Sequence, residues 1–328
     1  MVPNLTRDAS AALASGLGAP LARLRRSVEG GLPALLPPGG APILLRPRTP
    51  TPHPNIDRGL SLGRIGTLEV RLAARRSEIR RAQRLRYEVF YEEGAAIPSG
   101  LGMLKRRDID AYDAICDHLL VIDHAATEAT PFRAPRPRVV GTYRLLRGER
   151  AVAHFGFYSS GEYDLAPLLA RHAGKRFLEL GRSCVLKPYR TKRTVELLWR
   201  GIWTYVRAHR IDAMLGCASL EGTDPDRLAL PLSFLHHHAR APEAWRAAAL
   251  PERAVAMDRL APEAVDPRAA LAALPPLVKG YLRVGARFGD GAVVDRPFGT
   301  TDVLVVLPVA SIASRYVDHF GTDDRRAA

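Results

Sequence analysis

A strand, a helix and a second strand follow one another in residues 177–220, and this order restricts the fold more than any other feature of the sequence. The first strand begins at Phe177, and the second occupies residues 211–220. The helix between them covers residues 191–209, and its apolar stripe is formed by Val195, Leu198, Ile202 and Val206. Because two strands joined through one helix run parallel in the same sheet, this segment predicts a parallel crossover.

The other predicted elements make the sheet a mixed one. A helix with apolar residues at helical spacing is expected from about Ile79 to Val89. Neighbouring strands that are joined by loops pair antiparallel, so the strands outside the crossover form a meander. These further strands are predicted at residues 67–73, 117–123, 139–146 and 301–309. The predicted fold class is therefore α/β or α+β, with a mixed sheet flanked by helices.

The chain divides into an N-terminal segment and one large domain. Residues 33–54 are dense in proline, which breaks any helix or strand that begins there, so we expect residues 1–60 to be disordered. Residues 11–26 have leucines near one face and arginines beside it. Two alternatives stay open for them: a basic amphipathic helix at a membrane surface, or plain disorder. Residues 61–328 are expected to form one catalytic domain with a C-terminal elaboration.

The charge and the cysteine content limit the partners and the compartment. Forty-eight basic and 34 acidic residues give a net charge of +14, so we expect an anionic partner: nucleic acid, an acidic protein or a phospholipid surface. The three cysteines are widely spaced and form no C-x-x-C pair, which argues against a disulfide framework or a zinc ribbon and favours a cytoplasmic location. No apolar run reaches about 18 residues, so no transmembrane helix is expected.

Two charged residues lie inside the apolar strand that begins at Phe177. A strand interior is an unfavourable place for charge, so Glu179 and Arg182 are predicted to serve chemistry. In a regular strand they point to opposite faces, and a one-residue bulge at Gly181 would bring them to the same side. We therefore predict a bulged, splayed strand whose N–H groups hold a thioester carbonyl while Glu179 takes a proton from an attacking amine. The alternative is a buried structural ion pair.

Further charged residues stand where packing would favour apolar ones. Arg86 and Phe90 are four residues apart on the first helix and can face one pocket. Asp110 and Asp113 are three residues apart and can share a face, and Arg144 lies inside a predicted strand. Taken one at a time, each has a plainer interpretation: Arg144 as an outward strand residue and the two aspartates as part of a solvated loop.

Taken together, these residues resemble the pattern of the acyl-homoserine lactone synthases. That family carries R-x-x-x-F, D-x-x-D, Arg and E-x-x-R positions, and these match Arg86 with Phe90, Asp110 with Asp113, Arg144, and Glu179 with Arg182. The resemblance implies the GCN5-related N-acetyltransferase (GNAT) fold, a mixed sheet with splayed central strands and flanking helices.

Over roughly residues 66–320 the chain resembles more closely the ornithine-lipid-synthesising N-acyltransferases. The segments that carry this resemblance are LRYEVFYEE, LELGRSCV, TVELLWRGIW, LPPLVKGYLRVGARFGDGAVVD and FGTTDVLVVL. The family implies transfer of a 3-hydroxyacyl chain from acyl carrier protein to the α-amino group of L-ornithine, which gives lyso-ornithine lipid. Two enzymatic alternatives stay open: an acyl-homoserine lactone synthase-like activity, and acylation of glutamine, lysine or glycine. A basic membrane-binding or nucleic-acid-binding protein is the non-enzymatic alternative, and it leaves Glu179 unexplained.

The acyl donor is expected at the start of the helix that follows the charged strand. GNAT enzymes bind the coenzyme A pyrophosphate at a Q/R-x-x-G-x-G/A loop, whereas residues 190–195 read RTKRTV and lack both glycines. The free N–H groups of a helix start, with two basic side chains beside them, suit the single phosphate of a phosphopantetheine arm. The residues expected to bind this donor are Val185, Arg190, Lys192 and Arg193. The plainer interpretation is that Lys192 and Arg193 are ordinary exposed residues.

The resemblance also implies roles in substrate binding. Arg144 or Arg182 is predicted to bind the ornithine carboxylate, and Asp110 or Asp113 its side-chain ammonium group. Acyl carrier protein is acidic, so the basic residues at the helix start would help to dock it. Peripheral contact with an anionic membrane is a further expected interaction. We expect no cofactor, no metal site and no nucleic acid partner.

Overall fold

The structure is a computed structural model that describes residues 58–98, 100–130 and 133–312. All of these residues lie in one unit of the chain, Arg48–Ala328. The predictions for residues 1–57, including the candidate membrane helix at residues 11–26, fall outside the described residues and stay predictions. Within the described residues, no helix combines the length and the apolar composition that crossing a bilayer requires.

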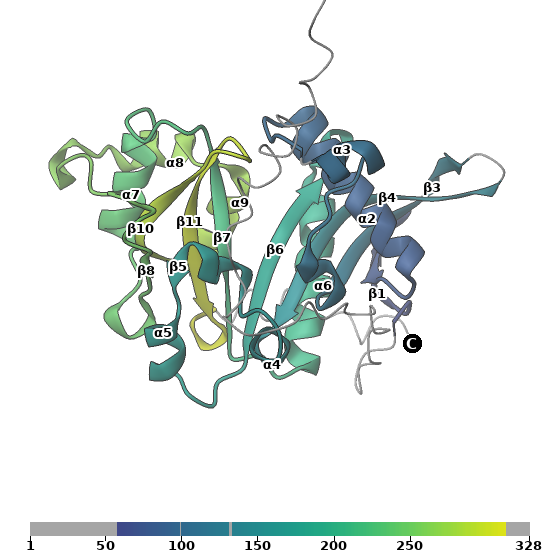
Figure 1. Cartoon of the computed structure of the whole chain (residues 1–328), viewed down its shortest axis with the longest axis horizontal. Coiled ribbons are helices and arrows are strands. Elements are labelled where there is room, and N and C mark those ends of the chain that lie inside the picture. The colour runs from purple at the N-terminus through teal and green to yellow at the C-terminus, as the bar shows by residue number, and fades with distance from the viewer. Residues whose placement is uncertain (1–57, 99, 131–132, 313–328) are drawn as a thin grey trace, which may run out of the picture. The chain divides into compact units, whose positions relative to one another are not determined.

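One mixed sheet of eleven strands runs through the described residues. The strands are β1 (Ser61–Ile65), β2 (Leu68–Leu72), β3 (Asp117–Thr130), β4 (Arg133–Arg147), β5 (Tyr163–Asp164), β6 (Phe177–Val185), β7 (Ala213–Glu221), β8 (Ala248–Ala249), β9 (Ala254–Val255), β10 (Arg287–Asp295) and β11 (Thr300–Pro308). Their order is β1-β2-β3-β4-β6-β7-β11-β10-β8-β5, with β9 paired to β10. β6 and β7 run parallel, and β4 and β11 flank them antiparallel (Figure 1). The predicted mixed sheet and its parallel crossover are confirmed.

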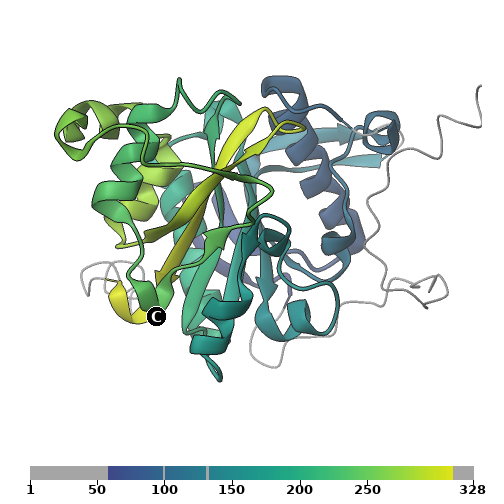
Figure 2. The same ribbon diagram turned by 60° about the vertical axis from the view of Figure 1, so that its left-hand side comes forward.

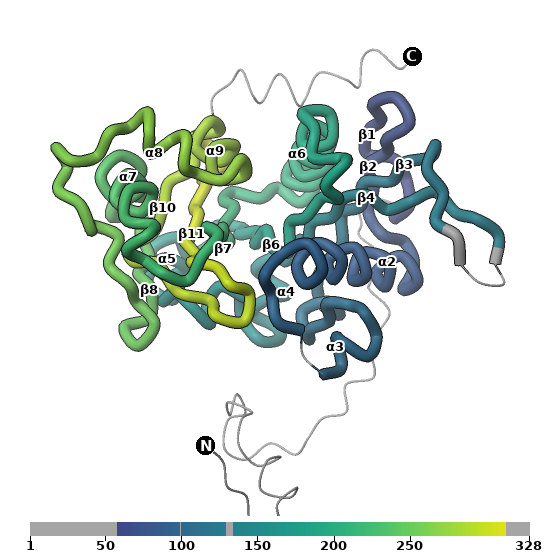
Figure 3. Tube along the Cα trace, turned by 90° about the horizontal axis from the view of Figure 1, so that it is seen from above, coloured from purple at the N-terminus to yellow at the C-terminus, as the bar shows by residue number. Residues whose placement is uncertain are grey.

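Helices cover both faces of this sheet. They are α2 (Arg76–Tyr87), α3 (Gly100–Lys105), α4 (Gly148–Val152), α5 (Ala166–Arg171), α6 (Lys192–Ala208), α7 (Ala229–Ala239), α8 (Pro267–Ala273) and α9 (Pro276–Arg283). α2 packs on β3 and β4, and α6 packs on β1 to β4 from the opposite side, as Figure 3 shows.

The crossover helix α6 begins where the sequence predicts. The hydroxyl of Thr191 accepts a hydrogen bond from the Thr194 N–H at 3.4 Å and so caps the first turn. The helix buries Leu198, and also Ile202 and Val206, against the sheet. Val195, which is predicted for the same stripe, is 47% exposed, although its neighbour Thr194 in the first turn is fully buried.

The central strands β6 and β7 separate part-way along their length. Their parallel ladder ends at the pair Glu179 and Leu215, and the two ribbons diverge beyond it (Figure 1). The next residue of β7, Gly216, has φ +153° and lies so near β6 that a Cβ there would be 2.3 Å from the carbonyl oxygen of Leu180. The predicted splay is confirmed, and a glycine occupies the point of separation.

The charged strand β6 also contains the predicted bulge. In its ladder with β4, Thr142 pairs with Cys184 but Arg144 pairs with Gly181, so β6 has one extra residue between these pairs. Arg182 lies in this extra stretch and adopts φ +49°, a left-handed conformation that residues other than glycine rarely adopt. The bulge is therefore centred on Arg182, one residue after Gly181, where the sequence predicted it.

Replacing Gly216 by alanine is expected to lower the free energy of unfolding by about 3 kcal/mol, because the new Cβ combines an unfavourable φ with a steric overlap. Chemical denaturation measures this change. Gly222→Ala is the matched control, since Gly222 has φ +113° but an added Cβ would meet no atom within 4 Å. We expect about 1 kcal/mol for the control. Equal losses in the two variants would show that the close approach at Gly216 is unimportant.

The C-terminal elaboration is part of the sheet and is not an appendage. β11 pairs along its whole length with β7. The turn between β10 and β11 reaches the segment that follows α2, where the Ile97 N–H donates to the Pro297 carbonyl at 2.7 Å. The rings of Phe90 and Phe298 meet edge to face there, with centroids 5.8 Å apart. Figure 2 shows this yellow hairpin extending towards the blue helices of the N-terminal half.

Candidate active site

A cavity of about 450 Å³ opens where β6 and β7 separate. Its walls come from the segment after α2, from β4, β6 and β7, and from the β10–β11 hairpin. The predicted site residues that line it are Phe90, Arg144, Glu179, Arg182 and Arg190. The other predicted site residues, all within the described part of the chain, lie outside its lining: Arg86, Asp110, Asp113, Val185, Lys192 and Arg193. A concave space of this kind is where proteins bind small substrates.

Glu179 reaches this cavity from the last position of the β6–β7 ladder and is 4% exposed. One loop holds its carboxylate: the Tyr158 N–H donates to Oε2 at 2.7 Å, and the N–H and hydroxyl of Ser159 donate to Oε1 at 2.7 and 2.6 Å. Burial raises the pKa of Glu179, although these hydrogen bonds and the charge of Arg144 act in the opposite direction. A carboxylate offers about four lone-pair positions, so one on Oε2 stays open to a substrate proton.

Glu179 and Arg182 do not pair with each other. Arg182 Nε lies 3.2 Å from Asp108 Oδ2, and its Nη2 lies 3.4 Å from Asp110 Oδ2 and 3.2 Å from the Tyr158 hydroxyl. Its guanidinium carbon also lies 4.9 Å from the centre of the Tyr158 ring. The alternative of a Glu179–Arg182 ion pair is therefore wrong, because the bulged backbone directs the guanidinium to the aspartates.

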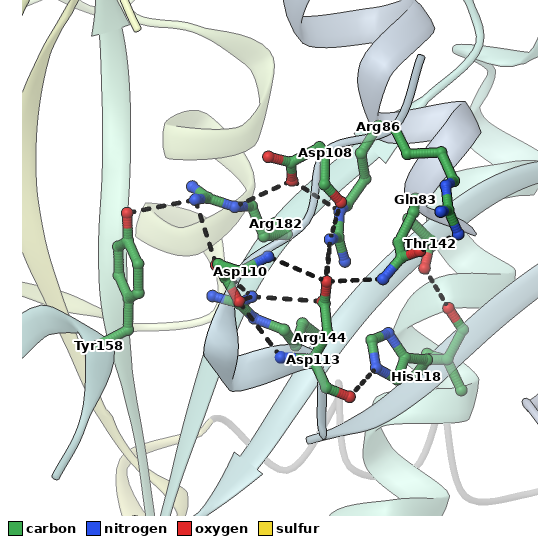
Figure 4. Close-up of polar contacts among 12 residues, drawn as sticks. Gln83, Arg86, Asp108, Asp110, Asp113, His118, Thr142, Arg144, Tyr158 and Arg182 are labelled. Atoms are coloured by element: carbon green, nitrogen blue, oxygen red, sulfur yellow. Dashed lines mark hydrogen bonds and ion pairs between the residues drawn. The ribbon is translucent and has the colours of Figure 1, made fainter. Parts of the chain in front are cut away.

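Three arginines and three aspartates form a buried charge network beside the cavity (Figure 4). Arg86 has no exposed surface and binds Asp108 through Nε at 2.8 Å and Asp113 through Nη2 at 2.8 Å. Arg144 Nη1 lies 2.6 Å from each carboxylate oxygen of Asp110. With Arg182 the positive and negative charges balance, which is required where an uncompensated charge would be strongly destabilising.

Asp113 is surrounded by donors from within the protein. Besides Arg86, the side-chain amide of Gln83 donates to its Oδ2 at 2.9 Å, and Arg144 lies 3.5 Å from Oδ1. Burial acts to raise the pKa of Asp113, but the charges of Arg86, His118 and Arg144 outweigh it and lower the pKa to about 2. The geometry is that of a structural carboxylate.

Sequence reasoning missed Asp108, Tyr158 and Ser159. Asp108 pairs with both Arg86 and Arg182, and the only signal for it is its position two residues before Asp110. Tyr158 and Ser159 lie in a 3-10 turn about 20 residues before Glu179, and no spacing rule marks them as its partners.

The residues predicted for the acyl donor lie around the start of α6. Arg190 lines the cavity, donates from Nε to the Val185 carbonyl at 3.0 Å and pairs with Glu93. Lys192 and Arg193 are exposed in the first turn of α6. Arg190 is thus the one of these basic residues that reaches the cavity wall.

Cys184 does not have the character of a nucleophile. It is buried, and burial raises the pKa of its thiol to about 12. Because the reactive form of cysteine is the thiolate, a thiol of this kind stays inert at neutral pH. The arrangement favours direct attack by an amine on a bound thioester.

The fold and the cavity define a GNAT acyltransferase. A family model described as an acetyltransferase (GNAT) domain matches residues 85–200. This match includes β6 with the buried carboxylate of Glu179, and the second splayed strand, β7, follows it in the chain.

Comparison with curated proteins identifies the family. The chain is 55% identical over 284 residues to the L-ornithine N(alpha)-acyltransferase of Agrobacterium fabrum (strain C58), which covers 87% of this chain and 94% of that protein. It is 54% identical over 265 residues to the protein of the same name in Rhizobium meliloti (strain 1021), which covers 81% and 88%. The chain belongs to the L-ornithine N(alpha)-acyltransferase family. Among solved structures it overlaps FeeM, an N-acyl amino acid synthase from uncultured soil microbes, over 74% of this chain and 91% of that one, with a TM-score of 0.40 and 11% identity.

Proposed function

We propose that this protein transfers a 3-hydroxyacyl chain from acyl carrier protein to the α-amino group of L-ornithine and forms lyso-ornithine lipid. Membership in the family supports the acyl transfer and the acceptor. The observation that carries the proposal is the buried Glu179 carboxylate, which lines the cavity between the splayed strands and keeps one lone-pair position open.

The reaction needs a neutral amine, because an ammonium group has no electron pair with which to attack. Glu179 takes one proton from the α-ammonium group, and the raised pKa of this carboxyl brings it nearer to neutral pH, where a base works best. The nitrogen then forms a bond to the thioester carbon, and the carbonyl electron pair moves to oxygen. Main-chain N–H groups of β6 beyond the last ladder pair with β7 are placed to hold that oxyanion.

Collapse of the tetrahedral intermediate completes the transfer. The oxyanion re-forms the carbonyl group, and the carbon–sulfur bond breaks. The sulfur leaves as a thiolate and takes the remaining surplus proton of the nitrogen, which gives an amide and a free carrier thiol. Glu179 returns its proton to water, so that protons and electrons balance over the cycle.

The geometry favours one of the two candidate arginines for the ornithine carboxylate. Arg144 is 4% exposed and is held by both oxygens of Asp110. Arg182 lines the cavity between the rings of Tyr158 and Phe298, with its bonds to the aspartates at the longer distances of 3.2 and 3.4 Å. We therefore assign the carboxylate to Arg182. Asp110 and Asp113 are already paired with arginines, which disfavours both as partners of the side-chain ammonium group.

Reversing the charge at the start of α6 is expected to weaken the donor interaction. The double variant Lys192→Glu, Arg193→Glu should raise KM for acyl carrier protein about tenfold, because both side chains are exposed where an acidic partner would dock. It should also flatten the salt dependence of kcat/KM. The matched control is Arg268→Glu, Arg283→Glu, which makes the same charge change at exposed positions of α8 and at the end of α9. Equal effects of the two pairs would contradict a docking site at α6.

The proposed reaction is tested by supplying 3-hydroxyacyl carrier protein and one acceptor at a time, and measuring free carrier thiol. L-ornithine should release thiol and yield a mass that corresponds to its N-acyl product. S-adenosylmethionine, glutamine and glycine should each give much less, and lysine should give an intermediate amount. Thiol release with S-adenosylmethionine but not with ornithine would replace the proposal by lactone synthesis.

The location of the protein and its contact with a membrane stay predictions. Exposed apolar and basic residues occur side by side in and after α3, where Leu101, Met103 and Leu104 precede Lys105 and Arg106. This combination is compatible with transient contact with anionic lipid. Co-sedimentation with vesicles that contain anionic or only neutral lipids measures it.

A further inference from the structure

Three acidic side chains meet at the β10–β11 hairpin: Asp295 and Asp302 line the cavity, and Glu162 lies next to them outside its lining. Glu162, Asp295 and Asp302 each place a carboxylate oxygen within 4.8 Å of the other two. Asp295 and Asp302 line the same cavity as Glu179. Arg253 lies 3.7 Å from Glu162 Oε1, but the described part of the chain gives Asp295 and Asp302 no ion-pair partner. This wall therefore carries an excess of negative charge.

Glu162 holds a buried oxygen that lacks a partner. The residue is 5% exposed, and its Oε2 accepts no hydrogen bond from any described residue. An unpaired buried acceptor destabilises a protein, and a bound donor would recover that loss. Burial and then the charge of Asp302 raise the pKa of Glu162 to about 7, and burial raises the pKa of Asp302. A bound cation would lower both values again.

A single loop connects this acidic group to the catalytic carboxylate. Ser159 binds Glu179, and Glu162 follows three residues later. Between them lies Cys217, whose thiol donates to the Ser159 hydroxyl at 3.4 Å and also contacts Glu162. The hydroxyl of the buried Tyr163 hydrogen-bonds to main-chain carbonyls of both β10 and β11, which fixes the loop against the hairpin. The base and the acidic group thus belong to one rigid assembly.

We infer that Glu162, Asp295 and Asp302 bind the side-chain ammonium group of ornithine while its α-amino group lies at Glu179. The inference rests on the proposed function and accounts for the acceptor specificity of the cavity. An ammonium group has three donors, which match the three converging carboxyl groups. An acceptor without a side-chain ammonium group leaves the three carboxyl groups without a partner, which weakens its binding strongly. Lysine has one more methylene than ornithine, and this difference changes binding far less. Norvaline, which is ornithine without the side-chain amine, should therefore be a much poorer substrate than lysine.

The test compares ornithine with norvaline in the wild type and in Asp302→Asn. We expect Asp302→Asn to raise KM for ornithine about 30-fold while kcat changes less than about threefold and KM for norvaline stays unchanged. Asp290→Asn is the control, because Asp290 is on the same hairpin but pairs with Arg240 outside the cavity. It should leave both KM values unchanged. Equal changes for ornithine and norvaline in Asp302→Asn would overturn the inference.

Two further results separate this inference from its rivals. If removal of metal with EDTA abolishes the preference for ornithine and Mn²⁺ or Ca²⁺ restores it, the three carboxylates bind a metal ion and the inference is wrong. If the wild type releases no carrier thiol with ornithine, the proposed reaction fails, and thermal stabilisation then tests binding alone. Stronger stabilisation by ornithine than by norvaline, lost in Asp302→Asn, would still support the acidic group as the ammonium site. No such difference would overturn it.

Discussion

Replacing Glu179 by glutamine is expected to lower turnover by about 10²-fold or more, with a much smaller change in KM for ornithine. The substitution keeps the shape of the side chain but replaces the basic carboxylate with a neutral amide, which does not take up the amine proton. Glutamine also places an amide beside the Tyr158 N–H, so the melting temperature must be measured alongside the rate. Near-normal turnover by a folded Glu179→Gln variant would refute the role of this residue as the base.

The dependence of the rate on pH gives the same assignment an independent readout. A base acts in its deprotonated form, so kcat/KM should fall as pH decreases through the pKa of Glu179, which burial raises above its ordinary value of 4.5. Ser159→Ala removes a hydroxyl donor that lowers this pKa. The acidic limb of the pH profile of kcat/KM should therefore move to higher pH by about 0.5 to 1 unit in Ser159→Ala. An unchanged limb would mean that a different group limits the rate.

The second large effect is expected from Arg86→Met, which should lower the free energy of unfolding by about 3–5 kcal/mol. Methionine fills much of the volume but leaves three aspartates with two arginines, so one buried negative charge has no compensating partner. Arg84→Met is the matched control on the same helix, since Arg84 is half exposed and lies 3.8 Å from Glu128. The control should change stability by less than about 1 kcal/mol. Urea denaturation compares the two, and equal losses would contradict a structural role for the network.

The network also predicts how stability responds to acid. The pKa of Asp113 is about 2 in the folded protein and 3.8 ordinarily, so its carboxylate stabilises the fold fully above pH 3.8. This contribution, about 2 kcal/mol, should disappear as pH falls towards 2. Arg86→Met lacks the principal attraction that lowers the pKa of Asp113. The loss of stability on acidification should therefore begin at a higher pH in this variant than in the wild type.

Much of the fold followed from local pattern. Apolar stripes at helical spacing predicted α2 and α6, and strand-like segments predicted β2, β3, β4 and β11. The positions of Glu179 and Arg182 predicted both a bulge and a splay, because neither charge suits a regular apolar strand. Such inferences succeed since they use residues that are close in the sequence, where backbone geometry is nearly fixed.

The partners of the charged residues could not be predicted in this way. Glu179 binds Tyr158 and Ser159 from a distant loop, and Arg182 binds Asp108, which no motif marked. Which carboxylate meets which guanidinium depends on how the loops pack, and several pairings satisfy the same sequence. The placement of Asp113 away from the cavity is a further result of this packing.

By itself, the sequence determined a mixed sheet with a parallel crossover and a central strand that carries Glu179 and Arg182. Only the tertiary structure decided that the β10–β11 hairpin forms a wall of the cavity and brings Asp295 and Asp302 near Glu162. These acids lie more than 130 residues from Glu162 in the chain. Their meeting depends on long-range strand pairing, because β11 reaches the site by pairing with β7, and no local periodicity encodes that contact.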